Sequence, residues 1–201
     1  MKYPENIEEI SALHPDYLGF IFWEKSSRNM DFNSIPDIPT NIKKVGVFVD
    51  ASIQEIATKI KQYQLDIIQL HGNETTIFCK NVKKLGVEVI KVFSVDSNFN
   101  FSKLKEYVFV VDYFLFDTKG KLPGGNGITF DWKILENYHL NIPYFLSGGI
   151  GNTEIDSLKS FIKTSAAKKC HGIDVNSRFE KKTGTKNKIK LEKFKKLLYE
   201  I

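Results

Sequence analysis

Cysteine is scarce in this chain, and long apolar runs are absent. The 201 residues include only Cys79 and Cys170, whose separation matches no metal-binding spacing. A disulfide framework is therefore not expected, and a reducing, cytoplasmic environment fits best. No apolar stretch approaches the ~20 residues that span a bilayer, and the polar, acidic start MKYPENIEEI is no signal peptide. We therefore expect a soluble cytoplasmic protein that does not enter a membrane.

Arginine is also rare, since only Arg28 and Arg178 occur among 29 basic residues. The net charge is +5, and the densest basic stretches run from Lys181 to Lys190 and from Lys193 to Lys196. Neither stretch interleaves aromatic residues as a base-stacking surface would. We interpret both as solvated lysine-rich faces and expect no nucleic-acid partner. The mildly positive field favours an anionic small molecule.

Seven short segments rich in β-branched and aromatic residues predict a parallel sheet. They are near-continuous apolar runs, as in strands that are covered on both faces. They are YLGFIFW from Tyr17, VGVFVD from Val45, DIIQLHG from Asp66, VEVIKVF from Val87, DYFLFDT from Asp112, IPYFLSGG from Ile142 and HGIDVNS from His171. Strand starts recur at intervals of roughly 20 to 30 residues, the length of a strand plus its return helix. We expect one α/β domain over residues 1–201.

Helical spacing fills the intervals between these segments. A capping box of Ser52 and Glu55 predicts one helix start. Asn73 and Asn152 are predicted to begin two further helices. Shorter helices are expected from Phe101 and Asp131, and the last helix is lysine-rich. The apolar stripe of that last helix is predicted to be Phe194, Leu197, Leu198 and Ile201.

The order of elements is informative, because the chain opens with a helix. Pro4 stands where a first-turn proline belongs, and Ile7, Ile10 and Leu13 share one face. Seven strands behind a leading helix are what remains of a TIM (βα)8 barrel without its first strand. We predict that fold. An open doubly wound sheet is the alternative, which periodicity does not exclude.

Two residues beyond strands carry the sharpest chemical predictions, because barrel enzymes place their chemistry at the carboxyl ends of strands. Asp117 ends an apolar segment, where partial desolvation suits a carboxyl to act as a general acid. A loop-capping aspartate is the alternative. Arg28 follows the first segment, and its planar fork suits a carboxylate ligand. An ordinary surface ion pair explains Arg28 about as well.

Two further strand ends predict a phosphate site. Ser147, Gly148 and Gly149 close one strand, and the two glycines allow a ligand to approach the backbone closely. Asp174, Asn176 and Ser177 close the last strand. The loops after strands seven and eight of such barrels often bind phosphate. The order of these two loops therefore indicates a phosphorylated small-molecule ligand.

Other polar residues receive structural interpretations. His71 is either a ligand contact or a structural residue, and we favour the structural interpretation. Asp112 begins its strand and is expected to stabilise the opposite end of the sheet, and both cysteines are expected to pack. The Gly-rich segment KGKLPGGNGITF, residues 119–130, is expected to form a mobile loop over the site, with a plain surface loop as the alternative.

Taken in order, these segments resemble phosphoribosylanthranilate isomerase. The matching pieces are PENIEEISALHPDYLGFIFWEKSSR, VGVFVD, DIIQLHG, DYFLFDT, GGNGITFDW, FLSGGI and GIDVNSRFE, over nearly the whole chain. The resemblance implies a cofactor-free Amadori rearrangement of N-(5-phosphoribosyl)anthranilate in tryptophan biosynthesis. It implies that Asp117 is the general acid and that Arg28 holds the anthranilate. The turns at Gly148–Gly149 and Asp174–Ser177 would then hold the phosphate, in a monomer or a homodimer.

The chain departs from that family in two respects. The family's general base is a cysteine in a Lys-Ile-Cys-Gly-like first strand, which neither Cys79 nor Cys170 matches. We expect an N-terminal shortening, from a start at an internal methionine or from trimming, and little or no catalysis by the chain as given. Arg178 also replaces a family glycine beside the phosphate turn.

Two alternative functions remain open. A non-catalytic barrel that binds a phosphorylated ligand would explain the missing cysteine. An indole-glycerol-phosphate synthase type of barrel would need a lysine acid or base, for which Lys91 is the only strand lysine that stands out.

Overall fold

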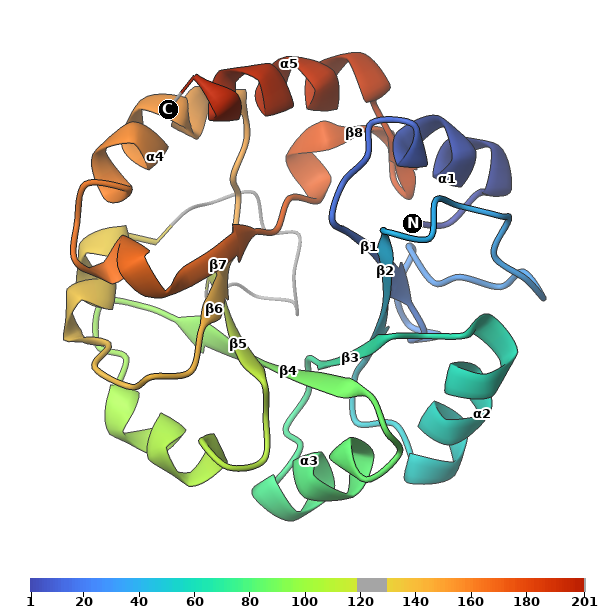
Figure 1. Cartoon of the computed structure of the whole chain (residues 1–201), viewed down its shortest axis with the longest axis horizontal. Helices are drawn as coiled ribbons and strands as arrows, with labels where there is room; N and C mark the ends of the chain where they lie inside the picture. Colours follow the sequence, from blue (N-terminus) through green and yellow to red (C-terminus); the bar gives the residue numbers. More distant parts are fainter. Residues whose placement is uncertain (119–129, 201) are drawn as a thin grey trace.

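A computed structural model of the chain describes residues 1–118 and 130–200. Its main sheet has seven strands, each hydrogen-bonded to the next in chain order and always parallel. They are β1 (Tyr17–Ile21), β2 (Lys43–Phe48), β3 (Ile67–Leu70), β4 (Glu88–Val95), β5 (Tyr113–Thr118), β6 (Tyr144–Leu146) and β7 (Cys170–Ile173). All seven strands expected from the sequence are thus confirmed. Figure 1 shows them curving into a ring that is open between β7 and β1.

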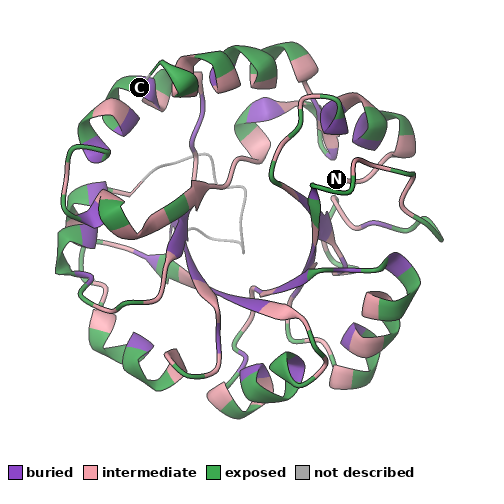
Figure 2. Cartoon of the chain, viewed as in Figure 1, coloured by how far each residue is buried: buried purple, intermediate pink, exposed green. Residues whose placement is uncertain are grey.

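Helices surround this ring on the outside. The α-helices are α1 (Pro4–Ser11), α2 (Ile53–Tyr63), α3 (Thr76–Lys83), α4 (Ile155–Phe161) and α5 (Lys188–Tyr199). Short 3-10 helices are η1 (Phe101–Tyr107), η2 (Trp132–Asn137), η3 (Asn152–Glu154), η4 (Ala166–Lys169) and η5 (Ser177–Phe179). A small antiparallel hairpin follows β7, made of β8 (Glu180–Lys182) and β9 (Thr185–Lys186). Figure 2 shows the buried stripe of the helices turned toward the sheet.

Capping chemistry explains which predicted helix starts are right. Ser52 Oγ accepts the backbone N–H of Glu55 at 3.1 Å, as expected for α2. The predicted start at Asn73 is wrong, because Thr75 caps α3 instead and accepts the N–H of Phe78. Asn152 makes no side-chain cap, and a 3-10 turn separates it from α4. Ile201 of the predicted C-terminal stripe lies outside the described residues.

The sheet separates a large outer core from a small inner one. The outer core joins the sheet to the helices, and Phe114 and Phe116 belong to it. The inner cluster consists of Val45, Ile67, Ile90, Val92, Leu115 and Phe145. Side chains alternate along a strand, so Asp117 shares the inner face with Leu115. The fold therefore aims this carboxyl into the ring.

Between β7 and β1 the ring stays open within the described residues. Tyr17 and His171 bridge the opening with one hydrogen bond of 2.8 Å between Oη and Nε2. The amino group of Met1 donates to the carbonyl of Gly19, on the unpaired edge of β1. The seven-stranded, incomplete barrel predicted from the sequence is confirmed, and the doubly wound alternative is not. None of the described helices is both long and apolar enough to cross a membrane.

Candidate functional site

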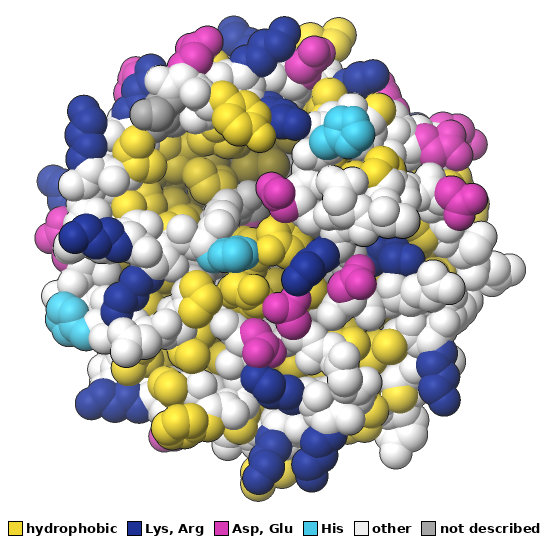
Figure 3. All heavy atoms as spheres, in the orientation of Figure 1, with side chains coloured by type: hydrophobic (Ala, Val, Ile, Leu, Met, Phe, Trp, Pro, Cys, Tyr) yellow, Lys and Arg dark blue, Asp and Glu magenta, His cyan; other side chains and the backbone are white. Residues whose placement is uncertain are grey.

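One cavity of about 740 Å³ collects the predicted site residues. It runs along the inner face of the sheet, from Tyr17 and Val45 near the amino ends of β1 and β2 to Asp117 at the carboxyl end of β5. It also extends through the opening between β1 and β7 to residues of α1 and α5. Figure 3 shows a hollow of this kind lined with apolar side chains. All seven predicted residues line the cavity: Arg28, Asp117, Gly148, Gly149, Asp174, Asn176 and Ser177. Parallel strands bring these distant positions to one rim because their carboxyl ends share one edge of the sheet.

Asp117 is only 5% exposed at the end of β5. Its Oδ1 accepts the backbone N–H of Thr118 at 2.8 Å. Its Oδ2 lies 3.6 Å from Nε2 of His71. One oxygen is therefore held by the backbone while the other borders the cavity. This arrangement suits a carboxyl that exchanges a proton with a bound molecule.

His71 shares the cavity wall with Asp117, a contact that the sequence did not predict. Its backbone N–H donates to the carbonyl of Phe48 at 2.8 Å, which fixes the residue just beyond β3. Its Nε2 is buried and has no hydrogen-bond partner among the described residues. A shift of a few tenths of an ångström would bring this nitrogen within hydrogen-bond distance of the Asp117 carboxyl. The imidazole can therefore orient that carboxyl or share a proton with it.

Asp174 brings a second carboxyl into the same cavity. Its Oδ2 accepts the hydroxyl of Ser147 at 2.7 Å. Burial raises the pKa of Asp174, Ser147 opposes this by hydrogen bonding, and the negative charge of Asp117 raises it further. Two acidic groups with different surroundings thus face one space, a pattern that recurs in acid–base sites.

The glycine turn after β6 depends on the absence of a side chain. Gly148 has φ +93°, and a Cβ built there would lie 2.2 Å from Oγ1 of Thr118. Gly149 also adopts a positive φ, +65°. The turn therefore lies directly against the end of β5, with backbone rather than side chain toward the cavity. Asn176 and Ser177 reach the same cavity from the end of β7.

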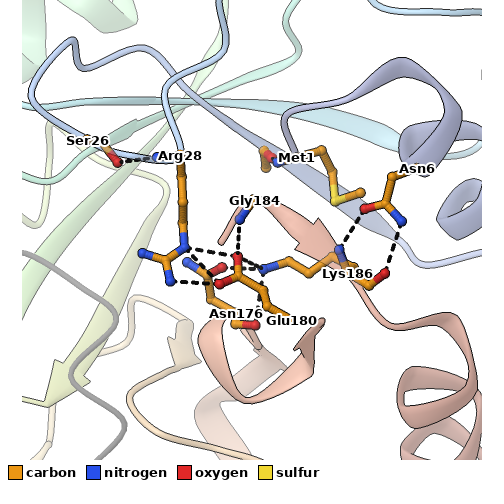
Figure 4. Close-up of polar contacts among 9 residues, drawn as sticks. Met1, Asn6, Ser26, Arg28, Asn176, Glu180, Gly184 and Lys186 are labelled. Carbon is orange, nitrogen blue, oxygen red and sulfur yellow. Dashed lines mark hydrogen bonds and ion pairs between the residues drawn. The ribbon is translucent and has the colours of Figure 1, made fainter. Parts of the chain in front are cut away.

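Arg28 does not extend freely into the cavity. It forms a forked ion pair with Glu180 of β8, with contacts of 2.9 Å from Nε to Oε1 and 2.7 Å from Nη2 to Oε2. Lys186 of β9 contacts the same carboxylate at 3.1 Å. Figure 4 shows these three side chains converging with Asn176. Sequence reasoning missed Glu180 and Lys186, because a contact across 152 positions leaves no local pattern.

The two cysteines have the packing roles expected of them. Cys79 is buried in the middle of α3, and Cys170 begins β7. Burial raises the pKa of each thiol to about 11. Neither residue lines the cavity. Among the described residues, no cysteine is placed to act as a base there.

Lys91 and Asp112 also have structural contacts. Lys91 faces the helices, opposite the inner residues Ile90 and Val92, and forms a buried ion pair of 3.0 Å with Glu74. It does not line the cavity, so the synthase-type alternative has no lysine there from β4. Asp112 accepts the N–H of Val89 and binds Lys83 at the opposite end of β5, as predicted. The predicted loop lies at 119–129, outside the described residues, apart from Phe130.

No group of three or more His, Cys, Asp or Glu side chains among residues 1–118 and 130–200 is arranged to hold a metal ion. A parallel sheet curved inside a layer of helices, with polar residues at the carboxyl ends of its strands facing one cavity, defines a TIM-barrel-type protein. The fold and the cavity alone do not identify the family within this class.

Comparison with known proteins supplies the family. The family model described as N-(5'phosphoribosyl)anthranilate (PRA) isomerase matches residues 1–196. A relative from Parabacteroides distasonis bearing that isomerase name is 41% identical over 199 residues, which cover 96% of this chain and 88% of its own. A relative from Crocosphaera subtropica with the same name is 37% identical, covering 93% and 90%. The chain belongs to the PRA isomerase family.

Solved structures agree with this assignment. The PRA isomerase from Thermotoga maritima superposes with a TM-score of 0.83 at 25% identity, covering 100% of this chain and 96% of its own. A second PRA isomerase structure, in complex with reduced 1-(o-carboxyphenylamino)-1-deoxyribulose 5-phosphate, superposes with a TM-score of 0.80 at 23% identity, with the same coverage. The TIM-barrel-type fold is thus shared.

Proposed function

We propose that this chain, acting as one domain, is a PRA isomerase of tryptophan biosynthesis. The reaction is the Amadori rearrangement of N-(5'-phosphoribosyl)anthranilate to 1-(2-carboxyphenylamino)-1-deoxyribulose 5-phosphate. The observation that carries the proposal is the convergence of Asp117, the Gly148–Gly149 turn and Arg28 on one cavity in a member of this family. The ligand-bound relative supports a phosphorylated small molecule as the substrate.

Each part of the cavity then has a chemical task. Asp117 protonates the ribose ring oxygen, and the C1′–O bond breaks to give a Schiff base with the anthranilate nitrogen. A base removes the proton from C2′, and the C–H electrons move toward the Schiff-base nitrogen to give an enolamine. A proton is then added at C1′ and the C2′ hydroxyl loses its proton, which gives the aminoketose. Gly148, Gly149 and Ser177 hold the phosphate, with Asp174 and Asn176 at the same turn. Arg28 holds the anthranilate carboxylate.

Within the described residues, no cysteine side chain lines the cavity, so no thiol is available there to act as the base. The 201-residue chain is therefore expected to bind the reduced product analogue but to turn over roughly 10²–10⁴ times more slowly than the same fold with a cysteine base in the cavity. The curated relatives bear the isomerase name, so the non-catalytic alternative is not favoured. A monomer and a homodimer both remain compatible with the proposal.

The proposal is tested by adding the base. A Lys-Ile-Cys-Gly-like strand placed before Met1 would end beside the unpaired edge of β1, where the Met1 amino group contacts Gly19. The loss of substrate fluorescence measures conversion. It should be fast with the extended chain and slow with the 201-residue chain. The matched control is the same extension with alanine in place of cysteine. A folded extended chain that neither converts the substrate nor binds the analogue would refute the proposed function.

A further inference from the structure

Glu180 is the centre of a buried charge cluster at the cavity rim. Its side chain is 7% exposed, and its two oxygens accept hydrogen bonds from Arg28, Lys186 and the backbone N–H of Gly184. Burial alone would raise the pKa of Glu180, but Arg28 and Lys186 outweigh it and lower the pKa. Glu180 is therefore a carboxylate that both Arg28 and Lys186 contact.

Lys186 serves as the anchor of this carboxylate. Its Nζ donates to Oε1 of Glu180 at 3.1 Å, to the carbonyl of Asn176 at 3.0 Å and to the Asn176 side chain. Three acceptors use the three protons of an ammonium group. Lys186 is thus tied both to the hairpin and to the turn after β7, and these contacts fix the position of the Glu180 carboxylate. Burial lowers the pKa of Lys186, and the charge of Glu180 opposes that shift.

The guanidinium of Arg28 is consequently held by one edge. Nε and Nη2 contact Glu180, and Nη1 makes no hydrogen bond to any described residue. Figure 4 shows this remaining nitrogen pointing away from Glu180. Arg28 lines the cavity, so the unused edge is the part of the fork that a ligand anion can reach.

We propose that Glu180 is a positioning residue, which orients Arg28 so that its unoccupied edge binds the carboxylate of the substrate's aromatic ring. This inference rests on the proposed function, because it assigns the ligand of Arg28. Glu180 then also contributes to ligand selectivity. The site prefers a carboxylated aryl amine because the buried Glu180 carboxylate, anchored by Lys186, holds the Arg28 guanidinium in place. Holding a flexible arginine in its binding geometry reduces the entropy lost on binding.

A simple charge argument predicts the opposite change in ligand affinity when Glu180 is neutralised, and this difference makes the proposal testable. The three side chains Arg28, Lys186 and Glu180 carry one net positive charge. If Glu180 only competed with the ligand or diluted this charge, then E180Q would bind an anionic ligand more tightly. If Glu180 positions Arg28, then E180Q binds the carboxylated ligand more weakly.

The experiment uses two ligands on the 201-residue chain in titration calorimetry. One is the reduced product analogue, and the other is its aniline counterpart, which lacks only the ring carboxylate. The wild-type chain should prefer the carboxylated ligand at least about tenfold, the equivalent of 1.4 kcal/mol. E180Q should lose most of that preference while its affinity for the aniline counterpart is unchanged. E180D keeps the charge but withdraws the carboxylate from Arg28, and it should lose the preference as well. E88Q removes the carboxylate of the distant Lys43–Glu88 pair and is the matched control, which should keep it.

A measurement on the unmodified chain complements the variants, and it decides the question if they do not fold. With only two arginines, the Nε–H signals of an isotope-labelled sample are readily assigned. Positioning predicts a protected Arg28 Nε–H signal that persists when the carboxylated ligand binds. Loss of that protection on binding would show that Glu180 is displaced, and would overturn the inference.

The remaining outcomes separate the two levels of the argument. If the wild-type chain binds neither ligand, the proposed function fails, and the inference fails with it. If it binds both ligands equally, Arg28 is not the carboxylate contact, and only the inference fails. If the preference survives in both E180Q and E180D, or grows in E180Q, Glu180 is no positioning residue although the isomerase proposal stands.

Discussion

Removing one partner of the buried ion pair between Lys91 and Glu74 is expected to destabilise the fold strongly, because it leaves the other charge buried without a counter-ion. Both side chains are at most 3% exposed, and their charged atoms are 3.0 Å apart. Lys91 Nζ also donates to the carbonyls of Leu70, Gly72 and Val92. The perturbation is K91M, which keeps most of the volume and the apolar stem but removes the charge and its donors.

The magnitude follows from what K91M leaves behind. Glu74 still accepts the N–H groups of Asp50 and Gly72, but its charge then has no cation within the outer core. Removing one partner of a buried pair costs about 3–5 kcal/mol. For a chain of this size that lowers the melting temperature by roughly 6–20 °C. K91M/E74Q keeps an amide oxygen for both N–H groups without the stranded charge, and it should recover at least about 1 kcal/mol.

Urea unfolding monitored by circular dichroism measures both effects. The control is K43M, which breaks the exposed Lys43–Glu88 pair and should cost about 1 kcal/mol or less. A K91M variant as stable as wild type, or a double variant whose loss is the sum of the single losses, would refute the reasoning. Folded K91M should still bind the reduced product analogue, because Lys91 faces away from the cavity. Lost binding would place Lys91 in the site after all.

Three further predictions concern the cavity itself. In the extended, cysteine-containing chain, D117N should lower kcat by roughly 10²–10⁴ with little change in analogue affinity, and a kcat within a factor of about two would show that Asp117 is not the acid. G148A forces a Cβ toward Thr118 at positive φ and should cost more than about 2 kcal/mol in urea unfolding, whereas G86A has the same type of φ with open space and should cost only about 1. Because the pKa of Asp174 is raised in the folded state, the unfolded carboxyl loses its proton first, and stability falls as pH rises from 3.8 through the raised value. D174N should therefore be relatively more stable at neutral than at acid pH in thermal melts, and an equal offset at all pH values would contradict the assignment.

Local chemistry accounts for the parts of the fold that could be predicted from sequence. The seven strands are covered on both faces, so their apolar runs stand out against the polar helices. Helix starts were less certain because several polar residues competed for each cap. Asn73 and Thr75 are two positions apart, and only the geometry of the turn, in which Asn73 N–H donates to Asp50, decides between them. The β8–β9 hairpin is lysine-rich and short, and it carries no alternation that could reveal it.

The candidate site divides in the same way. Strand-end residues such as Asp117 and Gly148 were predictable, because parallel strands deliver their carboxyl ends to one place whatever the details of packing. The side chains that orient them were not. His71 faces Asp117 only because β3 and β5 curve around the same interior, and Glu180 reaches Arg28 from a hairpin near the other end of the chain. Sequence position fixes which groups stand at the rim, whereas curvature of the sheet determines which of them meet.

The contacts of Arg28 in the folded chain explain why an arginine stands at this position in a sequence with so few arginines. From sequence, Arg28 was equally consistent with a carboxylate ligand and with an ion pair. The structure shows the ion pair, yet it uses only Nε and Nη2 and leaves Nη1 without a described partner. A lysine at this position would have a single ammonium group, which would bind either Glu180 or a ligand. A guanidinium has two edges, so it can be fixed by the protein and bind an anion at the same time. The two interpretations are therefore compatible, because one edge of the fork prepares the other.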